Sequence, residues 1–379
     1  MKRRNVILST LALAIAAALD VRATRAVPGE RSAARACGSH IGCAAAAPDG
    51  VGLDSAADVA GGAGEGQHFI DVERGWMLTH QSLLAHRIGA PLTGKLDQGS
   101  SRHGTAVLGI VCGTSSSYTG LAPRVASVHV SSTSESARSG IAAAIDRLVA
   151  INAADRNSAG GVLLLETQTR LATPEGGMGH LPAEALPQLF ELIAGATRRG
   201  ITVIEAAGNG RDTGSVPQGI DLDRFENERG ESFLKRDSVR GDSGAIVVGA
   251  GRSRTVAGKH EPVTSSNYGG RIDCYAWGEH VTVPAEAGCA ADFGETSAAA
   301  AIIAGVALIV QGVVAAAQPG MRLPPRQLRE ILSHRGLGTP CADGARNIGV
   351  MPDLAKILDA NVLGITPVRR NRSRAAARG

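Results

Sequence analysis

The sequence has few aromatic residues, which make up 3% of its 379 residues, and it contains no Cys-x-x-Cys pair. The scarcity of rings argues against a surface for stacking single-stranded nucleic acid. Without a Cys-x-x-Cys pair, neither a zinc site nor a thioredoxin-type motif has support. No repeat of about 20–50 residues is visible, which argues against a solenoid or propeller. Apolar residues make up 44%, so the chain can bury a sizeable core and wholesale disorder is excluded.

The positive charge of the chain comes from its two ends. Residues 1–26 carry a net charge of +4 and residues 367–379 carry +5, so the total of +4 leaves −5 for the residues between them. We therefore expect no nucleic-acid partner. The basic C-terminal residues, 363–379, are interpreted as a solvated, disordered tail; binding to an anionic surface is the alternative.

The N-terminus resembles a secretory signal peptide. A basic cluster (residues 2–4) precedes an apolar run (residues 6–19) that is too short to span a bilayer. We predict a signal peptide over residues 1–26, followed by a linker or short pro-segment over residues 27–63. The predicted location is secreted or periplasmic, and an uncleaved amphipathic start is the alternative.

The cysteines fit an exported protein. There are six, an even number that permits three disulfides. The close pairs Cys37/Cys43 and Cys274/Cys289 are the simplest pairings. Cys112 lies in an apolar helical stretch, where a small buried hydrophobic residue is expected.

Residues 64–362 are predicted to form one large domain, in which short apolar runs alternate with helical patterns. The predicted strands are His68–Val72, Ala126–Val130, Gly161–Glu166, Ile201–Ala206 and Ala245–Ala250. The predicted helices are Thr105–Cys112, Ser139–Ala154 and Pro182–Arg199. Strands that are apolar throughout, with helices between them, indicate a parallel sheet covered on both faces. The predicted fold class is therefore α/β, a three-layer sandwich with a mostly parallel central sheet.

One apolar stretch, Ala298–Ala317, is long enough to cross a membrane. It lacks flanking aromatic anchors, and Gly305 and Gly312 suit close packing against a neighbouring element. We favour a helix buried in the centre of the domain, with no stable membrane insertion; a membrane span is the alternative.

Three segments place a carboxylate, an imidazole and a hydroxyl at the ends of predicted elements. Asp71 lies near the carboxyl end of the first strand, the edge at which ligands bind in open α/β sheets. His103 lies at a helix start, and Ser297 lies at the start of the long apolar helix, whose free N–H groups suit an anionic intermediate. A serine needs an imidazole to take its proton and a carboxylate to orient that imidazole. Each residue alone is more often a helix cap or a turn residue.

A fourth segment makes the combination specific. Ala206–Gly210 (AAGNG) follows a strand and offers the Asn209 amide on a turn flanked by glycines. The order of Asp, HGT, GN and a GTS-like serine resembles the subtilases, the subtilisin-like serine peptidases, from about Gly64 to Gln318. Two further segments are similar to that family's late strand and "SNYG" turn: Gly241–Gly251 and Ser265–Gly269.

The resemblance implies an exported serine endopeptidase. Asp71 would orient His103, which would act as general base and then general acid. Ser297 would attack the scissile carbonyl, and the Asn209 amide would stabilise the oxyanion. It also implies that the Ser297 helix is the central buried helix of the domain.

The resemblance implies a polypeptide substrate held as an extended strand, and we expect a monomer. The positions expected beside the substrate are Leu165, Glu166, Ala207 and Gly208. No cofactor is expected and metal catalysis has no support. Structural calcium is common in the family, but the sequence has no Asp-x-Asp-x-Asp loop, and Asp221-Leu222-Asp223 is only a faint match.

Two positions depart from the family pattern. Glu295 replaces a glycine two residues before the nucleophile, and Ala301 replaces a proline four residues after it. A carboxylate at Glu295 is expected either to crowd the peptide-binding cleft or to raise the pKa of His103. This departure motivates an alternative function, a catalytically impaired binding protein that keeps the fold. An acyl hydrolase or transferase on the same residues is a third possibility.

A second serine motif must be weighed. Gly241-Asp242-Ser243-Gly244 resembles the nucleophile loop of chymotrypsin-like peptidases. Those proteins are double β-barrels with a different histidine motif, whereas this chain alternates helices and strands. We therefore interpret Ser243 as a turn residue that precedes the Ala245–Ala250 strand.

Overall fold

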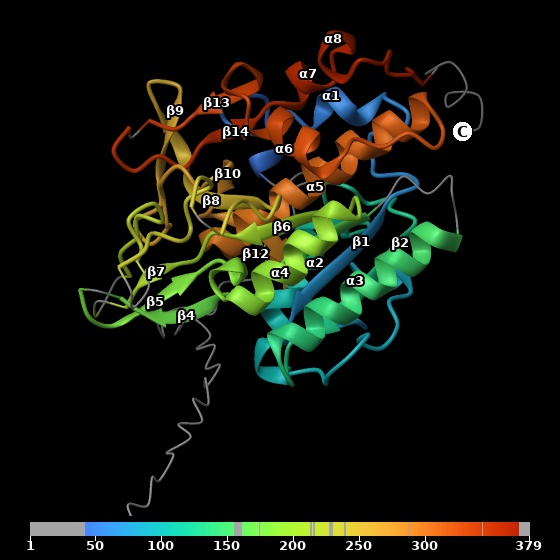
Figure 1. The fold of residues 1–379 in the computed structure, drawn as a ribbon. Coiled ribbons are helices and arrows are strands. Elements are labelled where there is room, and N and C mark those ends of the chain that lie inside the picture. The colour runs from blue at the N-terminus through green and yellow to red at the C-terminus, as the bar shows by residue number, and fades with distance from the viewer. Residues whose placement is uncertain are drawn as a thin grey trace, which may run out of the picture. The chain divides into compact units, whose positions relative to one another are not determined.

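The computed structural model (Figure 1) describes most of the chain between residues 42 and 370. The described ranges are 42–154, 161–173, 175–212, 214, 217–226, 230–238, 240–286, 288–342 and 344–370. The predicted signal peptide, the first part of the predicted linker, Cys37 and the end of the basic tail lie outside them.

The described residues are built around a twisted central sheet. Its strands, in spatial order, are β13 (Gly338–Pro340), β14 (Val350–Pro352), β10 (Cys274–Trp277), β8 (Ile246–Val256), β6 (Thr202–Ala206), β3 (Gly161–Leu165), β1 (His68–Glu73) and β2 (Ser127–Ser132). Neighbouring strands from β14 to β2 are parallel, whereas β13 is antiparallel to β14 and β9 (Lys259–Pro262) is antiparallel to β8. The predicted mostly parallel sheet is therefore confirmed.

Two smaller β structures lie outside this sheet. One consists of β4 (Thr169–Ala172), β5 (Met178–Leu181) and β7 (Gly210–Arg211), and the other is the hairpin of β11 (Val281–Pro284) and β12 (Cys289–Phe293). Neither was predicted from the sequence. Both flank segments that the sequence analysis had assigned to the site.

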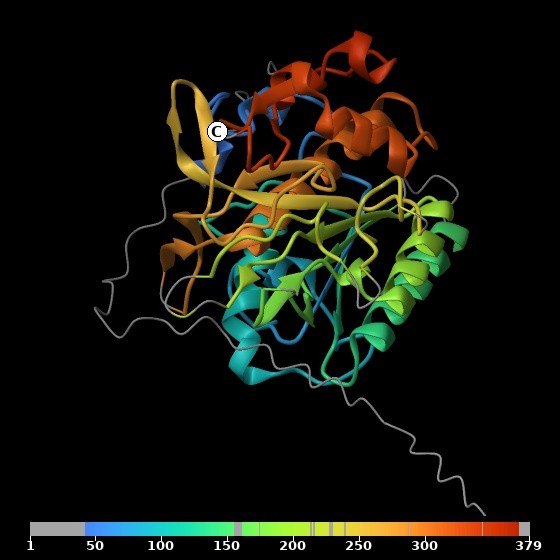
Figure 2. The ribbon, with the colours of Figure 1, turned by 60° about the vertical axis from the view of Figure 1, so that its left-hand side comes forward.

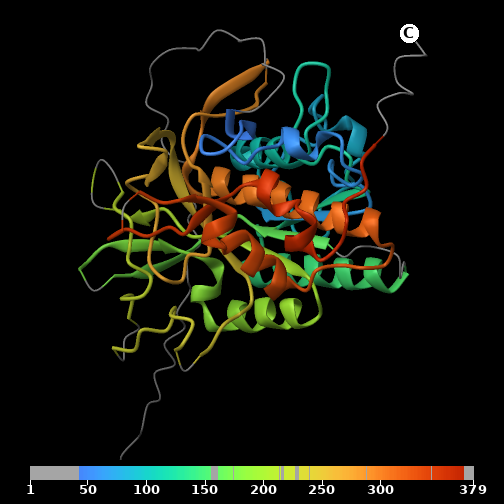
Figure 3. The same cartoon turned by 90° about the horizontal axis from the view of Figure 1, so that it is seen from above.

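Helices cover both faces of the sheet, which makes the fold a three-layer α/β sandwich (Figure 3). The long helices are α2 (Ser101–Cys112), α3 (Ala137–Ala154), α4 (Pro187–Arg198) and α5 (Glu295–Ala317), and shorter ones are α1 (Asp54–Ala57), α6 (Pro325–Ser333), α7 (Leu354–Ile357) and α8 (Ala360–Leu363). Single 3-10 turns are η1 (Gly42–Ala44), η2 (Leu84–His86), η3 (Gln98–Ser100), η4 (Ala183–Ala185) and η5 (Arg335–Leu337). In Figure 3, α3 and α4 (green) lie on one side of the sheet, and α5 (orange) lies on the other.

The period of two along each strand decides which side chains face which helices. In β1, Ile70 and Val72 belong to the core under α3 and α4, whereas Phe69 belongs to the core that contains α2 and α5. Leu163 and Leu164 of β3 divide in the same way. Polar residues at the carboxyl ends of β1 and β3 therefore point to one face or the other according to their parity.

The strand order reverses at β1. The chain runs from β1 through α2 to β2 on one side, and then returns through α3 to β3 on the other side of β1. Because successive crossovers on opposite faces open a crevice at such a switch point, the carboxyl ends of β1 and β3 are the expected position of a ligand site.

The folded unit is larger than the predicted domain of residues 64–362. Residues of the predicted linker, including Cys43, Val51 and Val59, are buried in the main core. At the other end the Ala60 N–H donates to Val368 O at 2.8 Å, and Arg370 forms an ion pair with Glu65. Figure 2 shows these first described residues (blue) beside the red C-terminal segment. The described parts of the predicted linker and tail thus belong to the folded unit.

Helix α5 is the centre of the larger core. It is long and apolar enough to cross a membrane, with a mean hydropathy of 2.4, but 94% of that stretch is buried within the protein. It packs against α2 and against β3, β6, β8 and β10. The prediction of a buried central helix is confirmed.

The predicted disulfide pairs do not form. Cys43, Cys112 and Cys274 are free, buried thiols. Each predicted pair requires one of these free thiols, so both Cys37/Cys43 and Cys274/Cys289 were wrong. Burial raises the pKa of the Cys43 thiol to about 12, as expected for a packing residue.

Candidate active site

A carboxylate and an imidazole meet at the carboxyl end of β1. Glu73 Oε2 lies 2.8 Å from His103 Nδ1, and the Glu73 side chain is 6% exposed. Glu73 is the last residue of β1 and His103 is in the first turn of α2. The imidazole is therefore held through Nδ1, which leaves Nε2 for a second partner.

The partner of His103 differs from the sequence prediction, which placed Asp71 there. Asp71 and Glu73 have the same parity on β1, and the strand extends one residue beyond its predicted end at Val72, so Glu73 reaches the edge and Asp71 lies one step deeper. The sequence signal was present, because two carboxylates at i and i+2 share a face. Only the exact end of the strand decides between them.

Asp71 lies behind Glu73 and supports it. Its Oδ2 accepts a hydrogen bond of 2.7 Å from the Trp76 indole N–H, and both residues are buried. Burial raises the pKa of Asp71 well above its ordinary value, and the adjacent Glu73 raises it further. Burial raises the pKa of Glu73 to about 8, while the hydrogen bond with Asp71 lowers it. Asp71 and Glu73 are therefore two interacting buried carboxyls on the same face of β1.

His103 packs against an aromatic ring. Its imidazole contacts Phe293 edge-on, with a centroid distance of 5.2 Å. The next residue, Gly104, allows α2 to approach the segment after β1 closely, because a Cβ there would lie 2.4 Å from both Gly75 O and Trp76 Cδ1. The glycine after the histidine is thus required by the packing of Trp76.

Ser297 lies in the first turn of α5. It is 4% exposed, and α5 begins at Glu295 after Gly294. The first N–H groups of a helix have no intrahelical acceptor, and the helix dipole adds positive potential there. A negatively charged oxygen beside Ser297 is therefore stabilised by the start of α5.

Asn209 is fixed next to Ser297. Its Oδ1 accepts hydrogen bonds from the Thr296 N–H at 3.2 Å and from Thr296 Oγ1 at 2.6 Å, and its own N–H donates to Gln168 Oε1 at 3.2 Å. Because the amide oxygen is occupied by Thr296, the orientation of the amide is set and its NH₂ group remains available as a donor.

The turn before Asn209 depends on Asn267 of the SSNYG segment. Asn267 Nδ2 donates to Ala207 O and to His180 O, both at 2.7 Å. Gly208 has a φ of +99°, and a Cβ there would meet His180 O at 2.2 Å. The resemblance had singled out this segment without a role. Its physical role is to hold the turn that carries Asn209.

The residues predicted to line the substrate are buried. Leu165 and Ala207 belong to the two cores, and Gly208 is buried as well. Glu166 is buried too, at 6% exposed. Their side chains therefore do not form a surface for the substrate.

Glu295 adopts the left-handed backbone region, with a φ of +60°. The Ser265 hydroxyl donates a hydrogen bond to its carboxylate, and burial raises the pKa of Glu295. Among the described residues no hydrogen bond or ion pair links Glu295 to His103, so the expected effect on the imidazole has no structural support. The positive φ explains why glycine suits this position.

Ser243 lies in a different environment. It is buried, and its hydroxyl donates to Glu184 Oε2 at 2.5 Å. Arg271 holds the same carboxylate through two contacts of 2.6 and 2.8 Å. We call Glu184, Asp242, Asp273, Arg271 and Arg329 the ion-pair network. The network has a structural role. Ser243 hydrogen-bonds to it, as suits a turn residue before β8.

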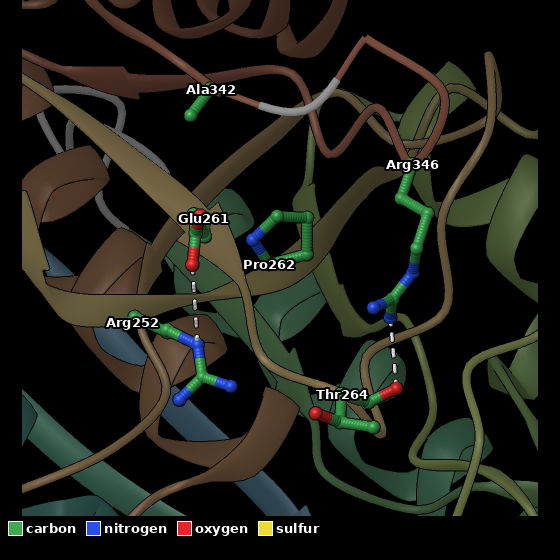
Figure 4. A pocket seen from close by; sticks show the side chains of 6 residues that line it. All are labelled: Arg252, Glu261, Pro262, Thr264, Ala342 and Arg346. Atoms are coloured by element: carbon green, nitrogen blue, oxygen red, sulfur yellow. Dashed lines mark hydrogen bonds and ion pairs between the residues drawn. The ribbon is translucent and has the colours of Figure 1, made fainter. Parts of the chain in front are cut away.

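A pocket of about 310 Å³ lies beside the SSNYG segment (Figure 4). Arg346 donates to Thr264 O at 2.8 Å and stacks over Tyr268 with 5.3 Å between guanidinium and ring centre. Arg252 pairs with Glu261 at 3.8 Å. The Arg346 contacts anchor the segment that positions Asn209. The pocket lies beside this segment, and none of the proposed catalytic residues lines it.

The described residues contain no group of three or more His, Cys, Asp or Glu side chains that could hold a metal ion. The faint calcium candidate is engaged otherwise: Asp221 lies 3.4 Å from the Arg224 guanidinium, and Asp223 accepts a hydrogen bond from the Gly270 N–H.

A doubly wound sheet with a carboxylate–imidazole pair and a serine at a helix N-terminus is the arrangement expected of a serine hydrolase. A family model described as the subtilase family matches residues 81–347, well over half of the chain. The chain belongs to the subtilase family, and its class is that of a serine peptidase.

Solved structures with this fold are distant in sequence. The MycP3 protease from a type VII (ESX-3) secretion system superposes with a TM-score of 0.57 at 19% identity, covering 82% of this chain and 86% of that one. The S41 psychrophilic protease gives 0.54 at 17% identity, covering 77% and 92%. A cold-adapted subtilisin-like serine proteinase gives 0.50 at 19% identity, covering 78% and 91%. These likenesses establish the fold, and no curated protein matches the chain.

Proposed function

We propose that the protein is an exported serine endopeptidase that hydrolyses peptide bonds through Glu73, His103 and Ser297. The observation that carries the proposal is the 2.8 Å contact between Glu73 and His103 Nδ1 at the sheet edge where α5 presents Ser297. Glu73 takes the orienting role that the sequence analysis gave to Asp71. Asp71 supports Glu73 from behind.

The proposed reaction has two halves. With its Nδ1–H donated to Glu73, His103 has an unprotonated Nε2 that takes the proton of the Ser297 hydroxyl as the oxygen attacks the scissile carbonyl. His103 then gives that proton to the leaving amine, and an acyl-enzyme remains on Ser297. A water molecule, deprotonated by the same imidazole, releases the acid product.

The oxyanion is stabilised in the proposed site by the Asn209 amide and by the start of α5. Asn209 is already oriented by Thr296 and Gln168, so it need not reorganise during the reaction. Replacing Asn209 by Ala is expected to lower kcat about 10²–10³-fold, a magnitude measured for the corresponding change in a subtilisin.

The first test is Ser297→Ala, measured on a protein substrate and a peptide amide. We expect kcat to fall on the order of 10⁶-fold, the size of loss known for a subtilisin without its nucleophile. Ser243→Ala is the matched control, because Ser243 hydrogen-bonds to a carboxylate and not to a histidine. Full activity of Ser297→Ala would refute the proposal. Wild-type activity on esters but not on peptide bonds would indicate an acyl hydrolase.

The alternative is a binding protein that keeps the fold but is catalytically impaired. One observation favours it: among the described residues no hydrogen bond joins His103 to Ser297. A fluorophosphonate probe separates the two functions. Labelling at Ser297, absent from Ser297→Ala, supports the peptidase, whereas no labelling of folded protein supports the alternative.

Export, polypeptide substrates and a monomeric state are parts of the proposal that rest on the sequence. The N-terminal sequence of protein recovered from the culture medium or periplasm is expected to begin near residue 27. Recovery of the intact chain from the cytoplasm alone would contradict export.

A further inference from the structure

Glu166 follows the carboxyl end of β3, directly beside Glu73. The register pairs Val72 of β1 with Leu165 of β3, and the Glu166 N–H donates to Val72 O at 3.2 Å. Its parity is that of Leu164, whose side chain belongs to the core that contains α2 and α5. Glu166 therefore points to the same face as Asp71 and Glu73, at the switch point of the sheet.

The Glu166 carboxyl group is enclosed. The residue is 6% exposed, and both carboxyl oxygens are shielded from solvent and make no well-formed hydrogen bond to a described residue. The groups that face it are Asp71 and Glu73 of β1, the His103 imidazole of α2 and the Ser297 hydroxyl of α5. The proposed mechanism gives a role to each of these four groups but none to Glu166.

The charges of this group do not balance if every carboxyl is ionised. We call Asp71, Glu73 and Glu166 the active-site carboxyls; together they would carry three negative charges against one imidazole. An unpaired carboxylate out of contact with water is costly, so such groups keep their protons instead. Burial raises the pKa of Glu166 well above its ordinary value; His103 opposes the rise, Glu73 and Asp71 add to it, and the Ser297 hydroxyl opposes it.

We infer that Glu166 is a positioning residue for Ser297 and that it acts as a neutral carboxylic acid, with its O–H directed to the Ser297 oxygen. The inference rests on the proposed peptidase function. A neutral Glu166 leaves the Ser297 proton to His103. An ionised Glu166 instead accepts the Ser297 hydroxyl as a hydrogen bond, and it places a negative charge beside the oxyanion.

This role makes activity depend on pH in a particular way. A Ser–His pair gains activity as the imidazole loses its proton and then reaches a plateau. Here activity is expected to fall again at higher pH, when Glu166 ionises next to Ser297 and His103. The site is therefore built for acidic to neutral conditions, and the fall at high pH belongs to Glu166.

The test compares Glu166→Gln with the wild-type chain between pH 4 and 10, by kcat/KM on a peptide amide and by the rate of fluorophosphonate labelling. Gln is neutral at every pH and keeps a donor, so we expect near wild-type rates at the optimum and no fall at high pH. The ratio of variant to wild-type rate should rise at least about 10-fold across that fall. Glu166→Leu, neutral but without a donor, should also lose the fall but react about 10-fold or more slowly throughout.

Three outcomes would overturn the inference: a wild-type profile that stays flat at high pH, a Gln variant that retains the fall, or a folded Gln variant inactive at every pH. Thermal unfolding at each pH tests whether the variants are folded. If they are not, the shape of the wild-type pH profile alone decides the inference. If the wild type is not labelled at any pH tested, the proposed function is refuted instead. Failure of the inference and failure of the proposed function are therefore distinguishable.

Discussion

Two groups of carboxyls among the described residues, the ion-pair network and the active-site carboxyls, are balanced in opposite ways. In the ion-pair network, Glu184 and Asp242 lie against guanidinium groups, and the Arg271 and Arg329 side chains lower the pKa of these carboxyls against the effect of burial. Among the described residues, the imidazole of His103 is the one basic group that acts on the active-site carboxyls, and burial raises the pKa of each carboxyl.

The difference shows what each group contributes. A carboxylate with a buried guanidinium is permanently charged and holds its neighbours in place, as Glu184 holds Arg271 and Ser243. A carboxyl without one holds a proton that can move near neutral pH, which suits acid–base chemistry. The number of nearby cations therefore separates the structural carboxyls from the reactive ones.

Within the two groups of carboxyls, the largest effect is expected from Glu73→Gln. The amide can hold the imidazole in the wrong tautomer, with Nε2 protonated, so kcat should fall about 10⁴-fold, as for the equivalent change in a Ser–His–Asp triad. Steady-state kinetics on a peptide amide measures it. Asp71→Asn, which keeps a donor toward Glu73, is the control and should cost far less. Equal losses in both variants would show that Asp71 is the orienting residue after all.

In the ion-pair network the corresponding change is Arg271→Met. It leaves Glu184 buried without its paired guanidinium, at a cost of about 3–5 kcal/mol in the free energy of unfolding. Denaturant unfolding measures the loss. Arg252→Met removes a partly exposed ion pair with Glu279 and should cost less than about 1 kcal/mol. Similar values for both would contradict the role given to the network.

The pH dependence of stability should have opposite signs in the two groups. Folding raises the pKa of Glu73 from 4.5 to about 8, so the folded chain keeps a proton that the unfolded chain releases. This group destabilises the fold progressively as the pH rises from about 4.5 to 8. The free energy of unfolding of Glu73→Gln, relative to that of the wild type, should therefore increase by on the order of 1 kcal/mol per pH unit in that window.

Asp242→Asn provides the opposite case for the same unfolding series. The pKa of Asp242 is lowered on folding, so its contribution is complete above the unfolded value of 3.8 and is lost as the pH falls below it. The variant should thus be less stable than the wild type by a constant amount from pH 5 to 8. A parallel trend in both variants would remove the distinction between the two groups.

The smallest effect is expected at Glu295, a carboxyl that accepts a hydrogen bond from Ser265 and has no ion pair with a described residue. Its φ of +60° is strained for a side chain with a Cβ, and glycine removes that strain. Glu295→Gly should be about 1 kcal/mol more stable than Glu295→Ala, because both lose the Ser265 bond but only Gly fits the backbone. Thermal unfolding compares them; a more stable Ala variant would contradict the argument.

The fold was largely predictable because its strands are continuously apolar and its helices have a clear period. The predicted strands His68–Val72 and Ala126–Val130 differ from β1 and β2 by one or two residues at their ends. The small sheet of β4, β5 and β7 was missed, because its short, half-exposed strands have no apolar run. Its pairing depends on contacts distant in sequence.

The site was predictable to the level of motifs but not of atoms. His103 and Ser297 lie in the first turns of α2 and α5, and Asn209 follows β6, as their motifs indicated. Glu73 was missed because one residue of strand length decides which carboxyl reaches the edge. Glu166 was assigned to the substrate because its parity and burial depend on its register with β1.

The contact between Trp76 and Asp71 gives the site a built-in optical probe. The chain has two tryptophans, and Trp76 is 1% exposed with its indole N–H on the Asp71 carboxyl. The other, Trp277, donates to the backbone oxygen of Asp49, away from the active-site carboxyls. A proton gained or lost at those carboxyls alters the electric field at the Trp76 ring. With Trp277→Phe as background, the emission of a single indole reports the charge of the site without substrate.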